Sequence, residues 1–257
     1  MNPDPTWLPQ GTVYGSLLNF QREYALWAPQ MAEPPYKAPP QAPVLYVKTA
    51  NTFAAHGASI AVPGEVEVGA ALGLVVSDFE LNRLKTLSGQ AQAAMNKEVF
   101  ECVLLADLNL PHASYYRPPI RFRNRDGFLG CGPASVPLTL GEIAALKLDV
   151  RVNGQLVQTV ELSTLVRDAA TLLADVGEFM TLQAGDVLML GTDCLPDGTR
   201  PRAKAGDRIE ISAPGFAPLV NTLVEEAAAA PGRPQQGAAP SGGSEDAAAR
   251  SVGASAL

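Results

Sequence analysis

The most informative pattern of hydrophobic and polar positions lies in EFMTLQAGDVLMLGT (Glu178–Thr192), which predicts a helix end, a tight turn and a buried strand. Gln183–Asp186 has turn composition, because Gly accepts positive φ angles and an Asp side chain bonds nearby backbone. The apolar run Val187–Leu190 then predicts a short strand buried on both faces. The strand ends in Gly191-Thr192, a small pair that allows a backbone and a hydroxyl to approach a bound molecule closely.

Similar patterns predict strands along most of the chain. Asn153-Gly154 lies between alternating apolar positions, and this dipeptide is a strong signal for a two-residue β-hairpin turn. The predicted strand segments are Thr12–Phe20, Val44–Phe53, Glu65–Ser77, Val99–Leu105, the two arms within Val150–Leu162, and the strands around the Pro214-Gly215 turn in Arg208–Glu225.

Helical patterns are fewer. Apolar residues recur at helical spacing from Leu165 to Val176, and Ser163 is the expected N-cap. A shorter helix is expected from Ser88 through Lys97. Pro29–Pro43 is rich in proline and is expected to be an extended surface loop. Many strands and few helices predict an α+β, β-rich fold dominated by mixed β-sheet.

Composition divides the chain into three parts. Residues 1–10 are polar and contain proline, which predicts a loose leader. Residues 11–226 have the composition of one folded domain. Residues 227–257 consist mostly of Ala, Gly, Pro, Ser and Gln, which predicts a disordered tail because no core can form from them.

Charge and cysteine content narrow the possible partners. The 257-residue chain has a net charge of −7 and a pI near 4.9, whereas phosphate binding needs clustered Lys and Arg. We therefore expect no nucleic-acid partner.

No apolar run is long enough to span a bilayer and no secretory leader is evident, which predicts a cytoplasmic protein with no membrane partner. The three cysteines, Cys102, Cys131 and Cys194, lack CxxC spacing and are expected to be reduced thiols.

Two segments resemble the fumarylacetoacetate hydrolase family. They are Glu178–Thr192 and SYYRPPIRFRNRDGFLGCGP (Ser114–Pro133), which are similar to the family's EFMTLxPGDxIxxGTP and YYRP…K-S-R-D-G stretches. The resemblance implies a mixed β-sheet roll of the fumarylacetoacetate hydrolase C-terminal-domain type.

The resemblance also implies a cofactor, Mg²⁺ or Mn²⁺, held in the family by two Glu and one Asp. Such carboxylates hold a hard cation and leave positions for a 2-oxo acid. Here Gly69 and Ala71 stand where the two Glu are expected, and only Asp107, in LLADLNL, aligns with a ligand. Glu65 and Glu67 form an alternative acidic pair on the same strand, but they lie four residues too early, about 13 Å along it. This chain is therefore expected to bind metal weakly.

Two further positions suggest catalytic candidates by resemblance. In LLNFQRE, Asn19 is kept and Glu23 replaces the family's His, so Glu23 is a candidate proton carrier; a plain surface carboxylate is the alternative. Arg123 replaces a Lys before the R-D-G motif. Arg keeps the charge and can pair with carboxylates, although it does not act as an acid or base. His56 and His112 match no family catalytic position.

A group of polar residues in motif context suggests substrate binding. The basic members are suited to a substrate with several carboxylates. Asn51, Arg125 and Asp126 also belong to this group of polar residues. For Arg125 and Asp126, the alternative is that they pair with each other in a turn. The candidate substrate-binding residues are Lys48, Tyr116, Arg117, Arg123 and Thr192.

Within the family, the pattern is similar to the N-terminal-type half of the bifunctional isomerase/decarboxylase of 4-hydroxyphenylacetate (homoprotocatechuate) degradation. The matching stretches include VGAALGLVVS (Val68–Ser77). The resemblance implies decarboxylation of 5-oxopent-3-ene-1,2,5-tricarboxylate and isomerisation of 2-hydroxyhepta-2,4-diene-1,7-dioate through metal-stabilised dienolates. It also implies a homologous metal-binding subunit, or a homo-oligomer, as partner. Two alternatives remain open: a catalytically silent structural subunit, and a binding module for an acidic metabolite.

Overall fold

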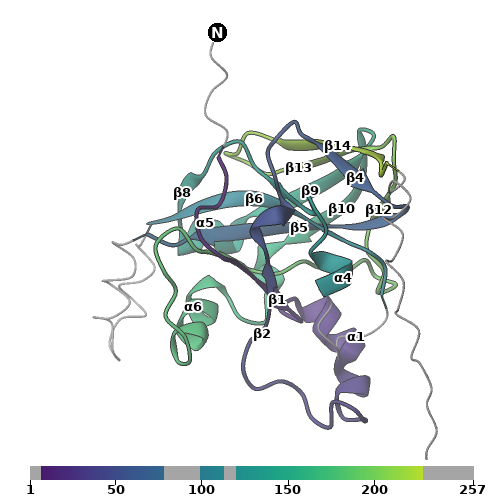
Figure 1. Cartoon of the computed structure of the whole chain (residues 1–257). Helices are drawn as coiled ribbons and strands as arrows, with labels where there is room; N and C mark the ends of the chain where they lie inside the picture. Colours follow the sequence, from purple (N-terminus) through teal and green to yellow (C-terminus); the bar gives the residue numbers. More distant parts are fainter. Residues whose placement is uncertain (1–6, 78–98, 113–119, 228–257) are drawn as a thin grey trace, which may run out of the picture. The chain divides into compact units, whose positions relative to one another are not determined.

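The computed structural model describes residues 7–77, 99–112 and 120–227, and this part of the chain is rich in strands (Figure 1). The helical elements are α1 (Gln21–Met31), η1 (Ala50–Thr52), α4 (Ile120–Arg123), α5 (Leu140–Ala145), η2 (Leu162–Thr164) and α6 (Ala169–Gly177). The strands are β1 (Val13–Leu17), β2 (Val44–Lys48), β3 (Phe53–Ala54), β4 (Ser59–Val62), β5 (Val66–Val75), β6 (Val99–Asn109), β7 (Leu129–Cys131), β8 (Val136–Thr139), β9 (Lys147–Val152), β10 (Gln155–Glu161), β11 (Val187–Met189), β12 (Arg202–Ala203), β13 (Arg208–Ser212) and β14 (Leu219–Glu225). The predicted α+β, β-rich class is confirmed.

The strands that the structure describes form two mixed sheets. The larger has nine strands, in the order β2-β1-β11-β5-β6-β7-β3, with β12 paired to β5 and β8 to β6. The smaller has five, in the order β10-β9-β13-β14-β4. The pairs β1–β11, β3–β7 and β4–β14 are parallel, and the other pairs are antiparallel.

β5 and β6 form the centre of the larger sheet. They pair antiparallel from Glu67 opposite Asn109 to Val75 opposite Glu101. Alternation along each strand divides the core in two, because successive side chains point to opposite faces. The side chains of Ala70 and Leu72 join the cluster shared with the smaller sheet, whereas Ala71 joins the cluster on the opposite face, together with residues of β1, β2 and α1. Gly69 and Asp107, opposite each other in the ladder, share the face of Ala71.

Several local predictions are confirmed. Asn153 and Gly154 have φ angles of 52° and 80° and connect β9 to β10 as a hairpin. In the Gln183–Asp186 turn, Gly185 has a φ of 89° and the Asp186 N–H donates to the Gln183 carbonyl. The turn leads into β11, which is buried on both faces.

Two predictions about helices were wrong in detail. Residues 21–31 form α1, which includes Pro29, so the predicted loop begins as the last turn of a helix. Buried Met31 packs on the sheet and stabilises this turn despite the proline. Helix α6 begins at Ala169, with Asp168 rather than Ser163 as N-cap. The Asp168 carboxylate accepts the Thr171 N–H at 2.8 Å, whereas Ser163 lies in η2.

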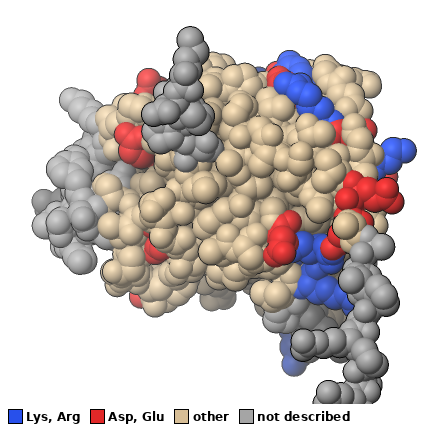
Figure 2. Space-filling view, turned by 45° about the horizontal axis from the view of Figure 1, so that its top comes forward, with Lys and Arg blue, Asp and Glu red and all other residues tan. Residues whose placement is uncertain are grey.

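The surface in Figure 2 carries charges of both signs, and the cysteines are buried. Among the described residues, no helix is long and apolar enough to cross a membrane. Figure 2 shows Lys and Arg beside Asp and Glu, without an unbroken basic area on that face. All three cysteines are free and buried, and burial raises the pKa of Cys131 to about 12. The predicted helix at Ser88–Lys97, Tyr116, Arg117 and residues 228–257 lie outside the described residues.

Candidate functional site

Asp107 lies at the centre of a buried charged cluster. It is placed by the long strand β6, and its partners come from β2 and α4. Asp107 Oδ1 lies 2.7 Å from Lys48 Nζ, and Oδ2 lies 3.2 Å from Arg123 Nη1. The Tyr46 hydroxyl also donates to Oδ2. Each of these four side chains is buried, so two cations face the Asp107 carboxylate and neutralise its charge away from water.

The Lys48 ammonium joins three chain segments. Besides its ion pair with Asp107, Nζ donates to the carbonyls of Leu108 at 2.9 Å, Arg123 at 2.6 Å and Phe128 at 2.9 Å. An ammonium has three protons, and four oxygens surround this one. The arrangement leaves Lys48 no free donor for the predicted contact with substrate, and the side chain instead ties β2 to β6, to α4 and to Phe128, the residue before β7.

Arg123 is held on two sides. Its guanidinium carbon lies 4.5 Å from the centre of the Tyr46 ring, within cation–π distance, while Nη1 contacts Asp107. Arg123 is only 2% exposed. Its Nε atom is buried and finds no hydrogen-bond partner in the described part of the chain. The predicted catalytic and substrate roles therefore fall on a side chain that already neutralises Asp107.

The pKa shifts of Asp107, Lys48 and Tyr46 arise from burial and from the charges of their neighbours. Burial raises the pKa of the Asp107 carboxyl, but Lys48 and Arg123 outweigh burial and hold it below its ordinary value. Burial lowers the pKa of Lys48, and Asp107 opposes that shift. Burial and the Asp107 charge raise the pKa of Tyr46 well above its ordinary value. Tyr46 is thus a neutral donor to an ionised carboxylate.

A divalent metal does not fit at this position. Gly69 lies opposite Asp107 in the strand ladder, and neither Gly69 nor Ala71 carries a ligand atom. A Cβ added at Gly69 would meet Thr192 Cγ2 at 2.6 Å, so the Thr192 methyl takes the space of the first expected Glu. Both Asp107 oxygens face cationic or hydroxyl partners. Within the described residues, no group of three or more His, Cys, Asp or Glu is arranged to hold a metal.

The alternative acidic pair is also placed away from a metal site. Glu65 precedes β5 and forms an exposed ion pair with Arg202 at 2.7 Å. Glu67 accepts a 2.7 Å hydrogen bond from Asn109 Nδ2 across the strand pair. The two carboxylates thus have separate partners.

A second charged cluster surrounds Glu23, close to Asp193 in the segment that follows β11. Glu23 is buried, accepts the Leu18 N–H at 3.2 Å and pairs with Arg200. Asp193 follows Thr192 and lies 3.3 Å from Arg22. Burial raises the pKa of Asp193, and Arg22 partly offsets that rise. The structure therefore makes Glu23 a buried, ion-paired residue rather than a surface carboxylate.

The remaining candidates lie apart from one another. Asn19 is buried and its amide donates to the carbonyls of Leu190 and Arg167. Arg125 pairs with Glu226 at 2.6 Å, while Asp126 accepts from Asn51, so these two residues have other partners than the alternative Arg125–Asp126 pair. Neither pair touches the Asp107 cluster.

Sequence reasoning missed Tyr46, Arg22, Arg200 and Asp193. Tyr46 had a detectable signal, because it alternates with Lys48 and must share its face of β2. The two arginines had none. Arg200 reaches Glu23 across 177 positions of sequence, and such a contact becomes visible only in the folded chain.

The fold and site together define a class of protein. The protein has two curled mixed sheets. The central antiparallel pair of the larger sheet, β5 and β6, carries Asp107 opposite Gly69, where the family resemblance implied a Glu. Residues 12–224 match the family described as fumarylacetoacetate (FAA) hydrolase C-terminal, and the chain belongs to this family.

Among curated relatives, the 4-hydroxyphenylacetate degradation bifunctional isomerase/decarboxylase of Salmonella dublin is 33% identical over 219 residues, which are 84% of this chain and 48% of that protein. The chain spans about half the length of the curated relatives it matches. Two Escherichia coli relatives, 32% identical over the same length, are also named bifunctional isomerase/decarboxylases.

Solved structures share the fold. The 2-hydroxyhepta-2,4-diene-1,7-dioate isomerase from Mycobacterium marinum superposes with a TM-score of 0.61 at 19% identity, covering 87% of this chain and 78% of that one. Maleylpyruvate hydrolase from Sphingobium sp. SYK-6, solved with manganese(II) and pyruvate, has a TM-score of 0.57 at 18% identity, covering 84% and 71%. A metal is thus present in a relative of this fold.

Proposed function

We propose that this chain is the metal-free subunit of an isomerase/decarboxylase that acts on 5-oxopent-3-ene-1,2,5-tricarboxylate and 2-hydroxyhepta-2,4-diene-1,7-dioate. A homologous subunit that keeps both acidic ligands holds the Mg²⁺ or Mn²⁺. The names of the relatives support the reaction class. The observation that carries the division of labour is the neutralisation of Asp107 by Lys48 and Arg123.

The charges around Asp107 explain why this chain does not act as the metal subunit. A divalent cation at the carboxylate would approach two cations that already lie within 2.7 and 3.2 Å of its oxygens. Like charges at such distances repel strongly where water is excluded. The same residues stabilise the core, so the position has become structural while the family fold is kept.

The test compares this chain, a metal-bearing homologue, and the co-purified pair. Calorimetric titration with Mg²⁺ is expected to show a saturable site in the homologue and in the pair, and none in this chain alone. Decarboxylation of the tricarboxylate should follow the same order. Size-exclusion chromatography of the mixture reports whether the two chains assemble.

Two results would overturn the proposal. One is a saturable Mg²⁺ site in the isolated chain that disappears in Asp107→Asn but persists in the control variant Asp126→Asn, whose carboxylate lies outside the cluster. The other is the absence of any complex with a homologue that carries both acidic ligands.

A further inference from the structure

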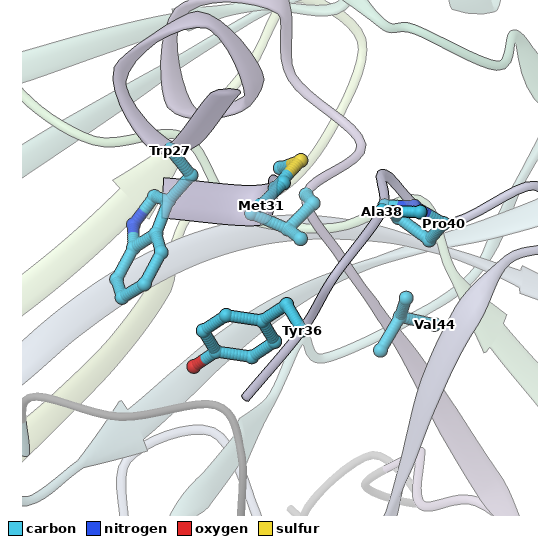
Figure 3. A pocket seen from close by; sticks show the side chains of 7 residues that line it. Trp27, Met31, Tyr36, Ala38, Pro40 and Val44 are labelled. Atoms are coloured by element: carbon cyan, nitrogen blue, oxygen red, sulfur yellow. The ribbon is translucent and has the colours of Figure 1, made fainter. Parts of the chain in front are cut away.

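An apolar pocket lies beside the charged cluster of Asp107, on the same side of the larger sheet. It is lined by Leu18 at the end of β1, Trp27 and Met31 of α1, Tyr36, Ala38 and Pro40 of the connecting segment, and Val44 of β2. Its volume is about 170 Å³. In Figure 3 the Tyr36 ring lies below Met31, with Trp27 to one side and Ala38, Pro40 and Val44 to the other.

The walls of the pocket are held by local structure. Prolines restrict the backbone of the segment between α1 and β2, and the N–H groups of Tyr36 and Lys37 both donate to the Glu33 carbonyl at 3.0 Å. Arg167 Nη2 donates to the Gln41 carbonyl at 2.8 Å and ties the segment to the body of the domain. A pocket with restrained walls loses little entropy when it binds a small molecule.

The lining selects for an uncharged ring. Among the described residues, the lining contains no Lys, Arg, Asp or Glu, so a polycarboxylate would lose its hydration there without gaining an ion pair. Trp27 and Tyr36 already meet edge to face, with ring centres 6.3 Å apart, and a third ring can extend this packing. A dry apolar cavity of about 150 Å³ is large enough to bind benzene, so this pocket is large enough for one six-membered ring.

We propose that this pocket binds a small, uncharged aromatic molecule of the size of phenol. The site goes beyond the proposed function and is separate from the position of Asp107. The two are neighbours, because Val44 lines the pocket and Tyr46, two residues further on the same face of β2, bonds to Asp107. An occupant would therefore lie next to the charged cluster without entering it.

Methyl NMR of methionine-labelled protein tests this site. An aromatic ring in the pocket shifts the ε-methyl signal of Met31, which lines it, and leaves Met189, in the core of β11, as internal reference. Met31→Leu assigns the signal. Phenol is the probe, and citrate is the charged comparator. We expect a saturable shift of Met31 with phenol and none with citrate.

A pair of matched variants locates the binding. Ala38→Leu adds a larger side chain at a position that lines the pocket, whereas Ala42→Leu adds the same group at a position of the same segment that does not line it; both positions are exposed. Phenol affinity is expected to fall at least about tenfold in Ala38→Leu, because the added carbons take up volume that the phenol ring needs, and to stay unchanged in Ala42→Leu. An unsaturable shift, equal shifts of Met31 and Met189, or equal affinities in the two variants would overturn the proposal. Metal binding by a homologous subunit does not enter this experiment, so its failure and that of the proposed function are distinguishable.

Discussion

At the scale of single residues, the Asp107 carboxylate lies between a lysine and an arginine, and its environment decides its role. A carboxylate that faces other carboxylates attracts a divalent cation, whereas Lys48 and Arg123 supply two fixed positive charges here. Tyr46 adds a neutral donor and stacks against Arg123. The group therefore contributes to stability rather than to metal binding.

Replacing Asp107 by Asn should destabilise the fold strongly. The change leaves two buried cations without their counter-charge, and breaking a buried pair in this way costs about 3–5 kcal/mol. Urea unfolding at pH 7 measures the loss. Glu65→Gln, which breaks an exposed pair with Arg202, should cost less than about 1 kcal/mol. Equal small losses in both variants would show that the Asp107 cluster is not coupled to folding.

The same carboxylate predicts a pH dependence. Because its pKa is lowered in the folded state, ionised Asp107 contributes stability that is fully present above the unfolded value of about 3.9. That contribution is lost as the pH falls further, through the folded-state pKa. The free energy of unfolding of the unmodified chain should therefore fall more steeply below pH 4 than that of Asp107→Asn. Parallel slopes in the two proteins would contradict this assignment.

At the scale of elements, β5 is close-packed because it carries glycines where neighbouring segments approach. A Cβ at Gly69 would meet Thr192 Cγ2 at 2.6 Å, and one at Gly73 would meet Val187 Cγ1 at 2.7 Å. These contacts bring β11 and the segment after it against β5. The position that the family uses for a ligand is thus occupied by packing.

Gly69→Ala should lower the free energy of unfolding by about 1–3 kcal/mol, as overpacking of a filled core does. The double variant Gly69→Ala with Thr192→Ser should recover part of the loss, because Ser lacks the methyl that the new Cβ meets. Gly64→Ala is the control, since nothing lies within 4 Å of its added Cβ. Denaturant titration of the four proteins provides the comparison, and an undisturbed Gly69→Ala would argue against this packing.

At the scale of the whole molecule, the residues up to Glu226 form one compact unit. Its core consists of two clusters on opposite faces of the larger sheet. Strand pairs and buried side chains hold this unit together, and its last strand, β14, ends at Glu225.

Deleting residues 227–257 should leave the unit intact. Their sequence lacks the apolar side chains needed to bury surface. The melting temperature should change by less than about 2–4 °C, the shift expected for a loss of 1 kcal/mol in a domain of this size. Calorimetry of the full and shortened chains measures it. A larger drop would show that these residues contribute to the folded unit.

Local pattern determined much of this protein. Alternation and apolar runs predicted most strands, Asn153-Gly154 predicted its hairpin, and Gln183–Asp186 predicted its turn, because these features depend on neighbours along the chain. Short motifs were sufficient to place the chain in its family and to mark Gly69, Ala71 and Asp107 as the positions of interest. Helix α1 escaped prediction, because the packing of Met31 against the sheet stabilises a turn that contains Pro29.

Only the tertiary structure decided what the candidate residues do. Lys48, Asp107 and Arg123 come from separate segments, and folding brings them together with Tyr46 in a buried cluster of two cations and one carboxylate. Charge and burial determine whether a carboxylate binds a metal or an ammonium, and both depend on residues distant in sequence. The sequence determined which side chains are present, while the packing of β2, β6 and α4 decided which partners each one has.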